Sequence, residues 1–95
     1  MKSIIDDSEN CYICQNFKGI TTKATDTHHC IGAANRKKAT VDGLTVRLCR
    51  QCHRLLHDQN LHYRDLQQIA ERAWLEHNNA SVEDWLKRYG KNYLD

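Results

Sequence analysis

Four cysteines of this 95-residue chain form two pairs, and two residues separate the thiols within each pair. The pairs are Cys11 with Cys14, and Cys49 with Cys52. Each pair lets two thiolates approach one ion from a tight turn, and two pairs complete the tetrahedral site that is typical of structural zinc. Four thiolates leave no open coordination position, so we expect this Zn²⁺ to stabilise the fold. A thioredoxin-like redox role is the alternative, but no βαβ pattern surrounds either pair.

The fifth cysteine and the N-terminus bear on the compartment of the protein. Cys30 is expected to be a small packed residue rather than a ligand. The odd number of cysteines argues against a complete disulfide framework. The first ten residues, MKSIIDDSEN, are acidic and lack the apolar core of a signal peptide, and no apolar run approaches the ~20 residues that span a membrane. We therefore expect a cytoplasmic protein without a membrane partner.

Four histidines form a second group whose spacing can bind a metal ion. His53 and His57 lie four residues apart in a segment predicted to be helical, so their imidazoles share one helix face. His28 and His29 are adjacent in a predicted strand, where neighbouring side chains point to opposite faces. Either of them can supply a third ligand, and the remaining histidine is then free to act as a base.

Short elements are expected to bring these groups together. A polar, β-branched stretch leads into a short strand that ends near His28 and His29, and the alternating segment LTVRL, residues 44–48, predicts a second strand. A helix is expected to follow from Cys49. The sequence therefore predicts an α+β domain in which a ββα finger, residues 11–57, is built around the four-cysteine site.

The remainder of the chain predicts two packing helices in a helical extension, residues 60–95. The first is expected to run from an Asn60 N-cap to about His77, with apolar residues at spacings of three and four on one buried face. The second follows Ser81, whose spacing to Asp84 resembles a capping box, and can end at Gly90. Residues 1–10 are expected to form a flexible tail, so that residues 11–95 make a single domain.

Positive charge gathers in the middle of the chain, although the formal net charge is only +2. The basic residues between positions 36 and 54 are opposed only by Asp42, and they are Arg36, Lys37, Lys38, Arg47, Arg50 and Arg54. A locally basic segment is what a phosphate-binding surface requires. The alternative is an ordinary solvated face.

The motifs CYIC, HH and LCRQCHRLLH together resemble the HNH endonuclease superfamily, also called the ββα-metal or His-Me finger group. The phrases HHCIGAANRKK and YGKNYL are similar to those of small phage and prophage HNH proteins. The resemblance implies a metal-dependent DNA endonuclease, acting in the cytoplasm of a bacterium or of a phage-infected host cell.

The resemblance also assigns roles to the histidines. The first histidine of the pair, His28, would bind the metal, and the second, His29, would be the base that activates water. His53 and His57 would complete the site around one catalytic divalent ion, which could be Mg²⁺, Mn²⁺, Ni²⁺ or Zn²⁺. The implied reaction is hydrolysis of a phosphodiester that leaves 5′-phosphate and 3′-hydroxyl ends.

One residue departs from the pattern of the family. The asparagine that tethers the loop behind the base usually stands just before the second strand, where this chain has Asp42. Either Asn35 takes the tethering role from another position, or Asp42 substitutes, or the tether is lost.

The resemblance and the basic segment together predict DNA as the partner. Arg36, Lys37 and Lys38 are predicted to hold the DNA backbone, and Arg54 to contact the scissile phosphate, with little sequence readout. Two alternatives remain open: a zinc-stabilised DNA-binding module without catalysis, and a structural scaffold. A protein partner or a homodimer is left undetermined.

Overall fold

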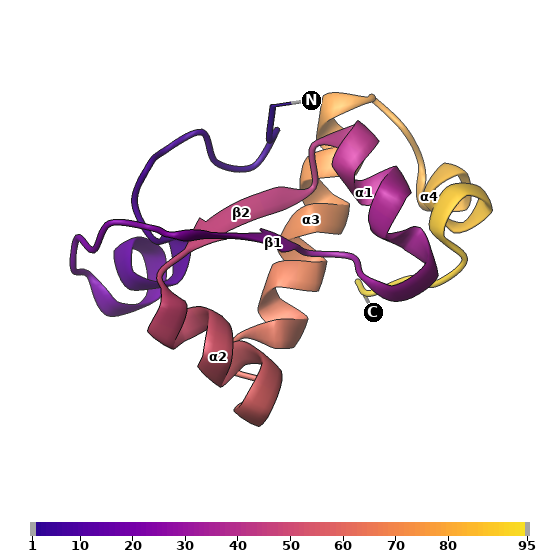
Figure 1. Cartoon of the computed structure of the whole chain (residues 1–95). Helices are drawn as coiled ribbons and strands as arrows, with labels where there is room; N and C mark the ends of the chain where they lie inside the picture. The colour runs from indigo at the N-terminus through magenta and orange to yellow at the C-terminus, as the bar shows by residue number, and fades with distance from the viewer. Residues whose placement is uncertain (1, 95) are drawn as a thin grey trace.

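The computed structural model describes residues 2–94 and has a small α+β architecture, as the sequence predicts (Figure 1). The helices and strands are β1 (Asp26–His29), α1 (Arg36–Asp42), β2 (Thr45–Leu48), α2 (Arg50–Gln59), α3 (Tyr63–His77) and α4 (Val82–Tyr89). A π-helical turn, Cys14–Lys18, precedes β1, and a 3-10 turn, Ala33–Asn35, leads into α1. Among the described residues, no helix has the length and apolar character needed to cross a membrane.

The two strands form an antiparallel sheet that fixes the direction of each histidine of the pair. His28 pairs with Val46, and His29 pairs with Thr45. Because side chains alternate along a strand, Asp26 and His28 share one face of β1, while His29 lies on the other. His28 is buried and His29 is half-buried. The predicted strand ending at this pair is therefore confirmed, and the two imidazoles point to different sides.

A helix, α1, connects the two strands and ends at a position that requires glycine. Gly43 has a φ of 74°, in the left-handed region, and its N–H caps the end of α1. A Cβ at this position would lie 2.5 Å from the carbonyl oxygen of Lys2. Both the backbone conformation and this close approach therefore exclude a side chain here.

The N-terminal segment, residues 2–10, is attached to the domain, which differs from the flexible tail that the sequence suggests. The Ile4 N–H donates to the Gly43 carbonyl at 2.9 Å, and the Ser3 hydroxyl donates to the Thr45 carbonyl. Ile4 and Ile5 pack against the core, and Asn10 forms a β-bridge with Lys23. The apolar pair within an otherwise polar segment supplies the burial that holds it in place.

The boundary between α2 and α3 also differs from the prediction. Asn60, expected to begin the third helix, instead ends α2 in the left-handed conformation, and the N–H of the next residue, Leu61, donates to the Leu55 carbonyl at 3.3 Å. Asparagine tolerates this conformation better than most residues, which suits it to the end of a helix. The predicted capping box of α4 is confirmed, because Ser81 and Asp84 exchange backbone and side-chain hydrogen bonds of 3.0 and 3.2 Å.

The core is continuous from the sheet to the helical extension. Val46 and Leu48 of β2 share one buried cluster with Leu66 and Ala70 of α3, which crosses the sheet in Figure 1. The predicted apolar stripe of α3 is thus largely confirmed. Further along α3, the ring of Trp74 meets the rings of α4, and its centroid lies 5.5 Å from that of Trp85.

Asp42, at the end of α1, ties that helix to both α3 and α4. Its carboxylate accepts hydrogen bonds from Trp74 Nε1 at 3.0 Å, from Arg88 Nη2 at 2.8 Å and from the Tyr89 hydroxyl. Lys38, one turn earlier in α1, donates to the Arg88 carbonyl at 2.9 Å. The helical extension is therefore joined to the connection between the strands by polar contacts as well as by apolar packing.

We expect the substitution Asp42→Ala to lower the free energy of unfolding by roughly 2–3 kcal/mol, because the buried Trp74 and Tyr89 donors lose their acceptor. Urea unfolding of the metal-loaded protein measures the change. Asp7→Ala, which removes an exposed carboxylate, is the control and should stay within about 0.5 kcal/mol of the parent. A loss for Asp42→Ala no larger than that of the control would contradict this role.

Candidate functional site

The four paired cysteines meet at one point in the fold. Cys11 and Cys14 lie at the start of the first helical turn, Cys49 is the N-cap residue of α2, and Cys52 lies in the first turn of α2. Their sulfur atoms all lie within 4.8 Å of one another. The two pairs are distant in sequence, so the meeting of their thiols is a tertiary feature of the fold.

The spacing of the sulfur atoms fits a single metal ion. Cys14 Sγ lies 3.6 Å from Cys52 Sγ and 4.0 Å from Cys49 Sγ. A tetrahedron with metal–sulfur bonds of about 2.3 Å has sulfur–sulfur edges of about 3.8 Å, so the cluster has the size of a four-thiolate site. Lys18 Nζ lies 3.6 Å from Cys52 Sγ, where its positive charge offsets part of the negative charge of the thiolates. This cluster can therefore hold one metal ion.

Cys30 stands outside this cluster and is buried, as expected for a packed residue. Burial raises the pKa of its thiol to about 12. It therefore remains a neutral thiol at physiological pH.

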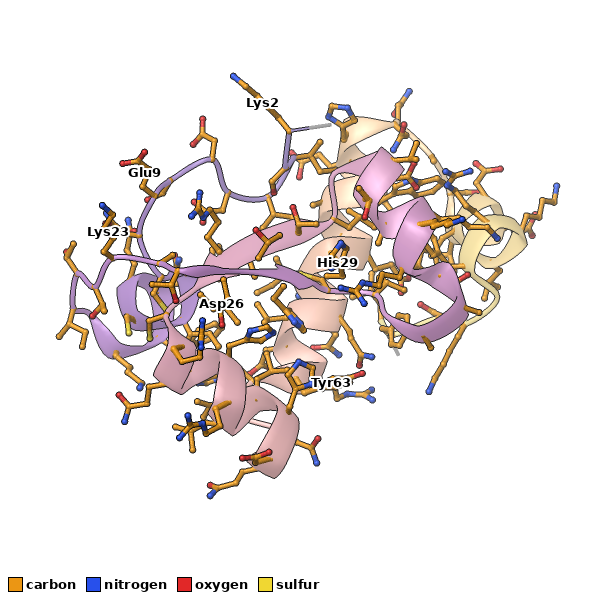
Figure 2. The ribbon with its side chains drawn as sticks, in the orientation of Figure 1. Lys2, Glu9, Lys23, Asp26, His29 and Tyr63 are labelled. Atoms are coloured by element: carbon orange, nitrogen blue, oxygen red, sulfur yellow. The ribbon has the colours of Figure 1, made fainter. Side chains whose placement is uncertain are left out.

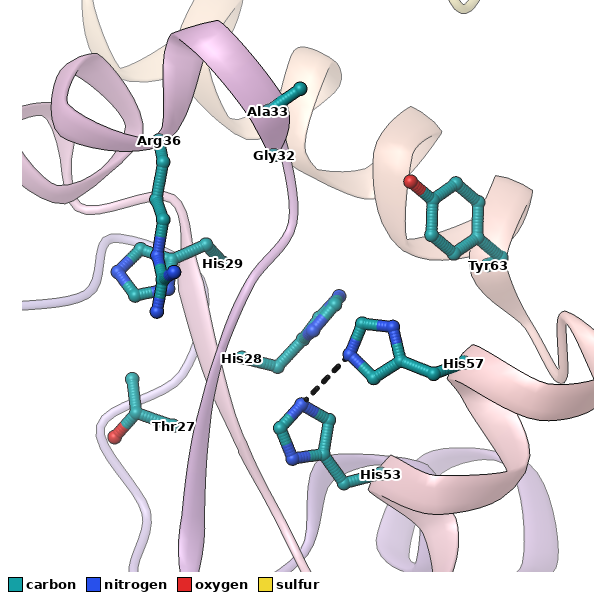
Figure 3. A pocket seen from close by; sticks show the side chains of 9 residues that line it. All are labelled: Thr27, His28, His29, Gly32, Ala33, Arg36, His53, His57 and Tyr63. Atoms are coloured by element: carbon teal, nitrogen blue, oxygen red, sulfur yellow. Dashed lines mark hydrogen bonds between the residues drawn. The ribbon is translucent and has the colours of Figure 1, made fainter.

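A second cluster consists of three histidines that come from β1 and α2. His28, His53 and His57 each offer a ring nitrogen within 4.8 Å of the others. The Nε2 atoms of His53 and His57 are 3.2 Å apart, as the dashed line in Figure 3 marks. Two nitrogens bound to one ion at about 2.0–2.1 Å in a tetrahedral arrangement lie about 3.3 Å apart, which matches this separation. The predicted metal ligands are thus brought together.

Burial sets the protonation state of the innermost ligand. Burial, and secondly the neighbouring His53, His57 and His29, together lower the pKa of His28 to about 4. His28 is therefore neutral at physiological pH. Because a neutral imidazole is the form that binds metal, this ligand needs no deprotonation before it accepts an ion.

Asp26 orients His53, a role that the sequence analysis missed. The His53 Nδ1 atom lies 2.9 Å from Asp26 Oδ2, and Arg50 Nε lies 3.1 Å from the same oxygen. With Nδ1–H donating to the carboxylate, Nε2 of His53 is left free as a metal ligand. These contacts, with His53 first and Arg50 second, lower the pKa of Asp26 to about 2. The available sequence signal was its position two residues before His28, on the same strand face.

His29, the predicted base, lies on the other side of β1 and borders the same pocket. The pocket has a volume of about 270 Å³. Figure 3 shows His29 beside Arg36 on one side of the strand and the three clustered histidines on the other. In Figure 2, His29 lies at one end of β1, and Asp26 lies at the other end of this strand, beside the start of α2. Burial, and secondly the charge of Arg36, lower the pKa of His29, which favours its unprotonated form.

The two residues considered as tethers for His29 have other partners. The Asn35 side-chain amide donates to the Tyr89 carbonyl at 3.1 Å, and the carboxylate of Asp42 is occupied by α3 and α4. The structure therefore places Asn35 and Asp42 at the junction with α4 and does not bring either side chain to the pocket lining. In the sequence, only their distance from His29 could indicate which residue acts as the tether. That distance does not reveal these long-range contacts.

The predicted DNA-binding residues are spread over two helices. Arg36, Lys37 and Lys38 are exposed on α1, and Arg54 is exposed on α2. Of these, Arg36 borders the pocket, whereas the ammonium of Lys38 is engaged by the end of α4.

Comparison with family models, with curated proteins and with solved structures finds no match to this chain. The features of this chain that can support a function are the two clusters and the pocket that joins the second cluster to His29.

We expect the substitution Cys14→Ser to abolish stoichiometric metal binding and to unfold most of the domain, because binding at such sites supplies on the order of 10 kcal/mol of folding free energy. Metal content by mass spectrometry and helicity by circular dichroism measure both effects. Cys30→Ala is the matched control, since it removes a buried thiol outside the cluster and should retain one tightly held ion. Equal metal content in both variants would contradict the assignment.

We expect Asp26→Ala to weaken metal binding at the histidine cluster by about 10- to 100-fold, because His53 loses the group that fixes its ring. Calorimetric titration with Ni²⁺ measures this affinity in protein whose cysteine site is already filled. Asp65→Ala is the control, since Asp65 makes an equivalent 2.8 Å contact with His62 away from the cluster. An unchanged affinity in Asp26→Ala would remove the orienting role.

Proposed function

We propose that this chain is a metal-dependent DNA endonuclease of the HNH type, with zinc in its four-cysteine site. The observation that carries the proposal is the arrangement around the pocket. Three imidazoles converge from β1 and α2, and a fourth, His29, borders the same space from the opposite side of β1. A site of this kind can hold an ion and an unprotonated base on two sides of one substrate group.

The order of elements supports the same proposal. A β1–β2 hairpin and the following α2 supply all the proposed ligands and the base, as the resemblance to HNH proteins implies. Zinc is the proposed ion at the cysteines because tetrahedral thiolate sites select it over harder cations.

Three neutral nitrogen ligands favour a transition metal over magnesium at the histidine cluster. Imidazole suits Zn²⁺, Ni²⁺ and related ions, whereas Mg²⁺ prefers oxygen ligands. The nearby carboxylate of Asp26 is already occupied by His53 and Arg50. We therefore propose that Ni²⁺ or Zn²⁺ supports activity at lower concentrations than Mg²⁺.

In the proposed reaction, each residue has a separate task. His28, His53 and His57 would hold the ion, which would supply Lewis-acid stabilisation of the negative charge that develops during hydrolysis. His29 accepts a proton from the attacking water, and its lowered pKa keeps it in the required form. Arg36, which borders the pocket beside His29, pairs with a phosphate oxygen. Lys37 and Arg54 are exposed and contribute salt-dependent affinity for the DNA backbone.

A non-catalytic DNA-binding module is the second candidate. It is favoured by the position of Asn35, whose amide is held by the Tyr89 carbonyl instead of supporting His29. In that case the basic residues around the pocket bind DNA without cleaving it. The phage or prophage origin remains a prediction of the resemblance, and the cytoplasmic location remains a prediction of the sequence.

We expect the parent protein to nick supercoiled plasmid and His29→Ala to nick it about 10²- to 10⁴-fold more slowly, because general base catalysis contributes a factor of this size. Gel assays with Mg²⁺, Mn²⁺, Ni²⁺ and Zn²⁺ measure the rates. His77→Ala removes an exposed histidine of α3 and is the matched control, expected to cut as the parent does.

Parent protein that shifts DNA in a gel but leaves plasmid intact with every metal would favour the binding module. Parent protein that neither binds nor cuts DNA would remove both candidates. Equal rates for the parent and His29→Ala would keep the nuclease but assign the base to another group.

A further inference from the structure

The pocket above the histidine cluster has two walls of different character. Tyr63, the first residue of α3, stands beside His57 on one side, and Gly32 and Ala33 lie across the opening from it (Figure 3). The side chain of Tyr63 is 36% exposed, so its aromatic ring borders open space. One wall therefore presents a ring and the other presents little or no side chain.

Neither the backbone conformation nor the local packing requires a glycine at Gly32. Its φ of −103° lies in the extended region, which residues with side chains also adopt. A Cβ built at this position meets no atom within 4 Å. Gly43, by contrast, needs its missing side chain for both conformation and space. The fold therefore tolerates a side chain at Gly32, but a side chain there would narrow the pocket.

Tyr63 is held in place by the turn that precedes it. The ring of His62 stacks on Phe17 with centroids 3.9 Å apart, and His62 Nδ1 lies 2.8 Å from Asp65 Oδ2. The Tyr63 N–H donates to the Asn60 carbonyl at 3.1 Å. The backbone that carries Tyr63 is thus fixed by contacts that do not depend on any ligand, which places the ring at the edge of the pocket before a ligand binds.

We propose that Tyr63 and Gly32 border a slot for a nucleoside next to the scissile phosphate, and that the Tyr63 ring stacks on its base. This inference rests on the proposed nuclease function. With a phosphate on the clustered histidines, the adjoining sugar and base enter the rest of the roughly 270 Å³ pocket, between the aromatic wall and the glycine. Aromatic rings beside a phosphate-binding site are the usual platforms for unpaired bases.

The slot defines the class of substrate. Bases in a duplex are stacked inside the helix, and extracting one costs a few kcal/mol, least where the base is already unpaired. A nucleotide in the slot is therefore unpaired, and the preferred substrate is a single strand, a frayed end or a locally opened duplex. The competing interpretation is that Tyr63 serves only the protein: burial, and secondly the nearby hydroxyl of Tyr63, raise the pKa of the Tyr93 phenol.

The test measures binding without cleavage, in the whole 95-residue chain carrying His29→Ala. The protein is loaded with zinc at the cysteines and with Ni²⁺ at the histidine cluster. Fluorescence anisotropy compares two probes: an eight-nucleotide thymidine strand, and an abasic strand of the same length and charge. In this background we add Tyr63→Ala, Gly32→Val or Tyr63→Phe. Melting temperatures identify any variant that fails to fold, and Gly32→Val is expected to melt with the parent.

We expect Tyr63→Ala and Gly32→Val to weaken binding of the thymidine strand by at least about fivefold, the effect of losing one stacked base, and to leave the abasic strand unaffected. Tyr63→Phe keeps the ring and should bind both probes as the background protein does. Equal weakening of both probes, or no weakening of either, would overturn the slot. If the parent protein cleaves plasmid but the background protein binds the thymidine and abasic strands equally well, the slot alone is overturned. If no DNA probe binds at all, the proposed function is overturned with it.

Discussion

The meeting of the four cysteine thiols at one point is the constraint on which the rest of the structure depends. The two CxxC pairs enclose the segment that contains β1, α1 and β2, so an ion between them closes this segment into a loop. The second pair lies at the start of α2, which fixes where that helix begins and which way its side chains project. The positions of His53 and His57 follow from this, because they lie on the turns of α2 directly after the cysteines. A chain of this size has a limited core, and metal binding can supply the missing folding free energy.

The histidine cluster illustrates how one short strand can separate two chemical tasks. Alternation along β1 turns His28 inward, to a position where burial keeps it neutral, and turns His29 to the half-exposed side beside Arg36. Because of the same alternation, Asp26 lies on the same face of β1 as His28 and contacts His53. A strand shifted by a single residue would exchange these faces, so the register with β2 matters as much as the residue types.

Local patterns in the sequence predicted the two strands and the helices α2, α3 and α4 but did not predict α1, and they failed where distant contacts decide the outcome. The strand alternation, the cysteine pairs and the Ser81 capping box each depend on residues within a few positions of one another, and all were predicted. Asn60 was misassigned because an asparagine suits either end of a helix. The contacts of Asp42 and Asp26 join residues that are far apart in sequence, and no local pattern reports them. The attachment of the N-terminal segment depends on the space left beside Gly43, which exists only in the folded domain.

Cys52 and His53 are consecutive residues in the first turns of α2, so the two clusters share one rigid body. An ion at the thiolates fixes the start of the helix, and an ion at the histidines fixes the same helix against β1. Each therefore removes conformational freedom that the other would otherwise have to remove. Thermodynamic linkage then requires that each occupied site raise the affinity of the other by the same factor. An ion at the thiolates would in this sense be an effector of the histidine cluster, and an ion at the histidines would protect the first from loss.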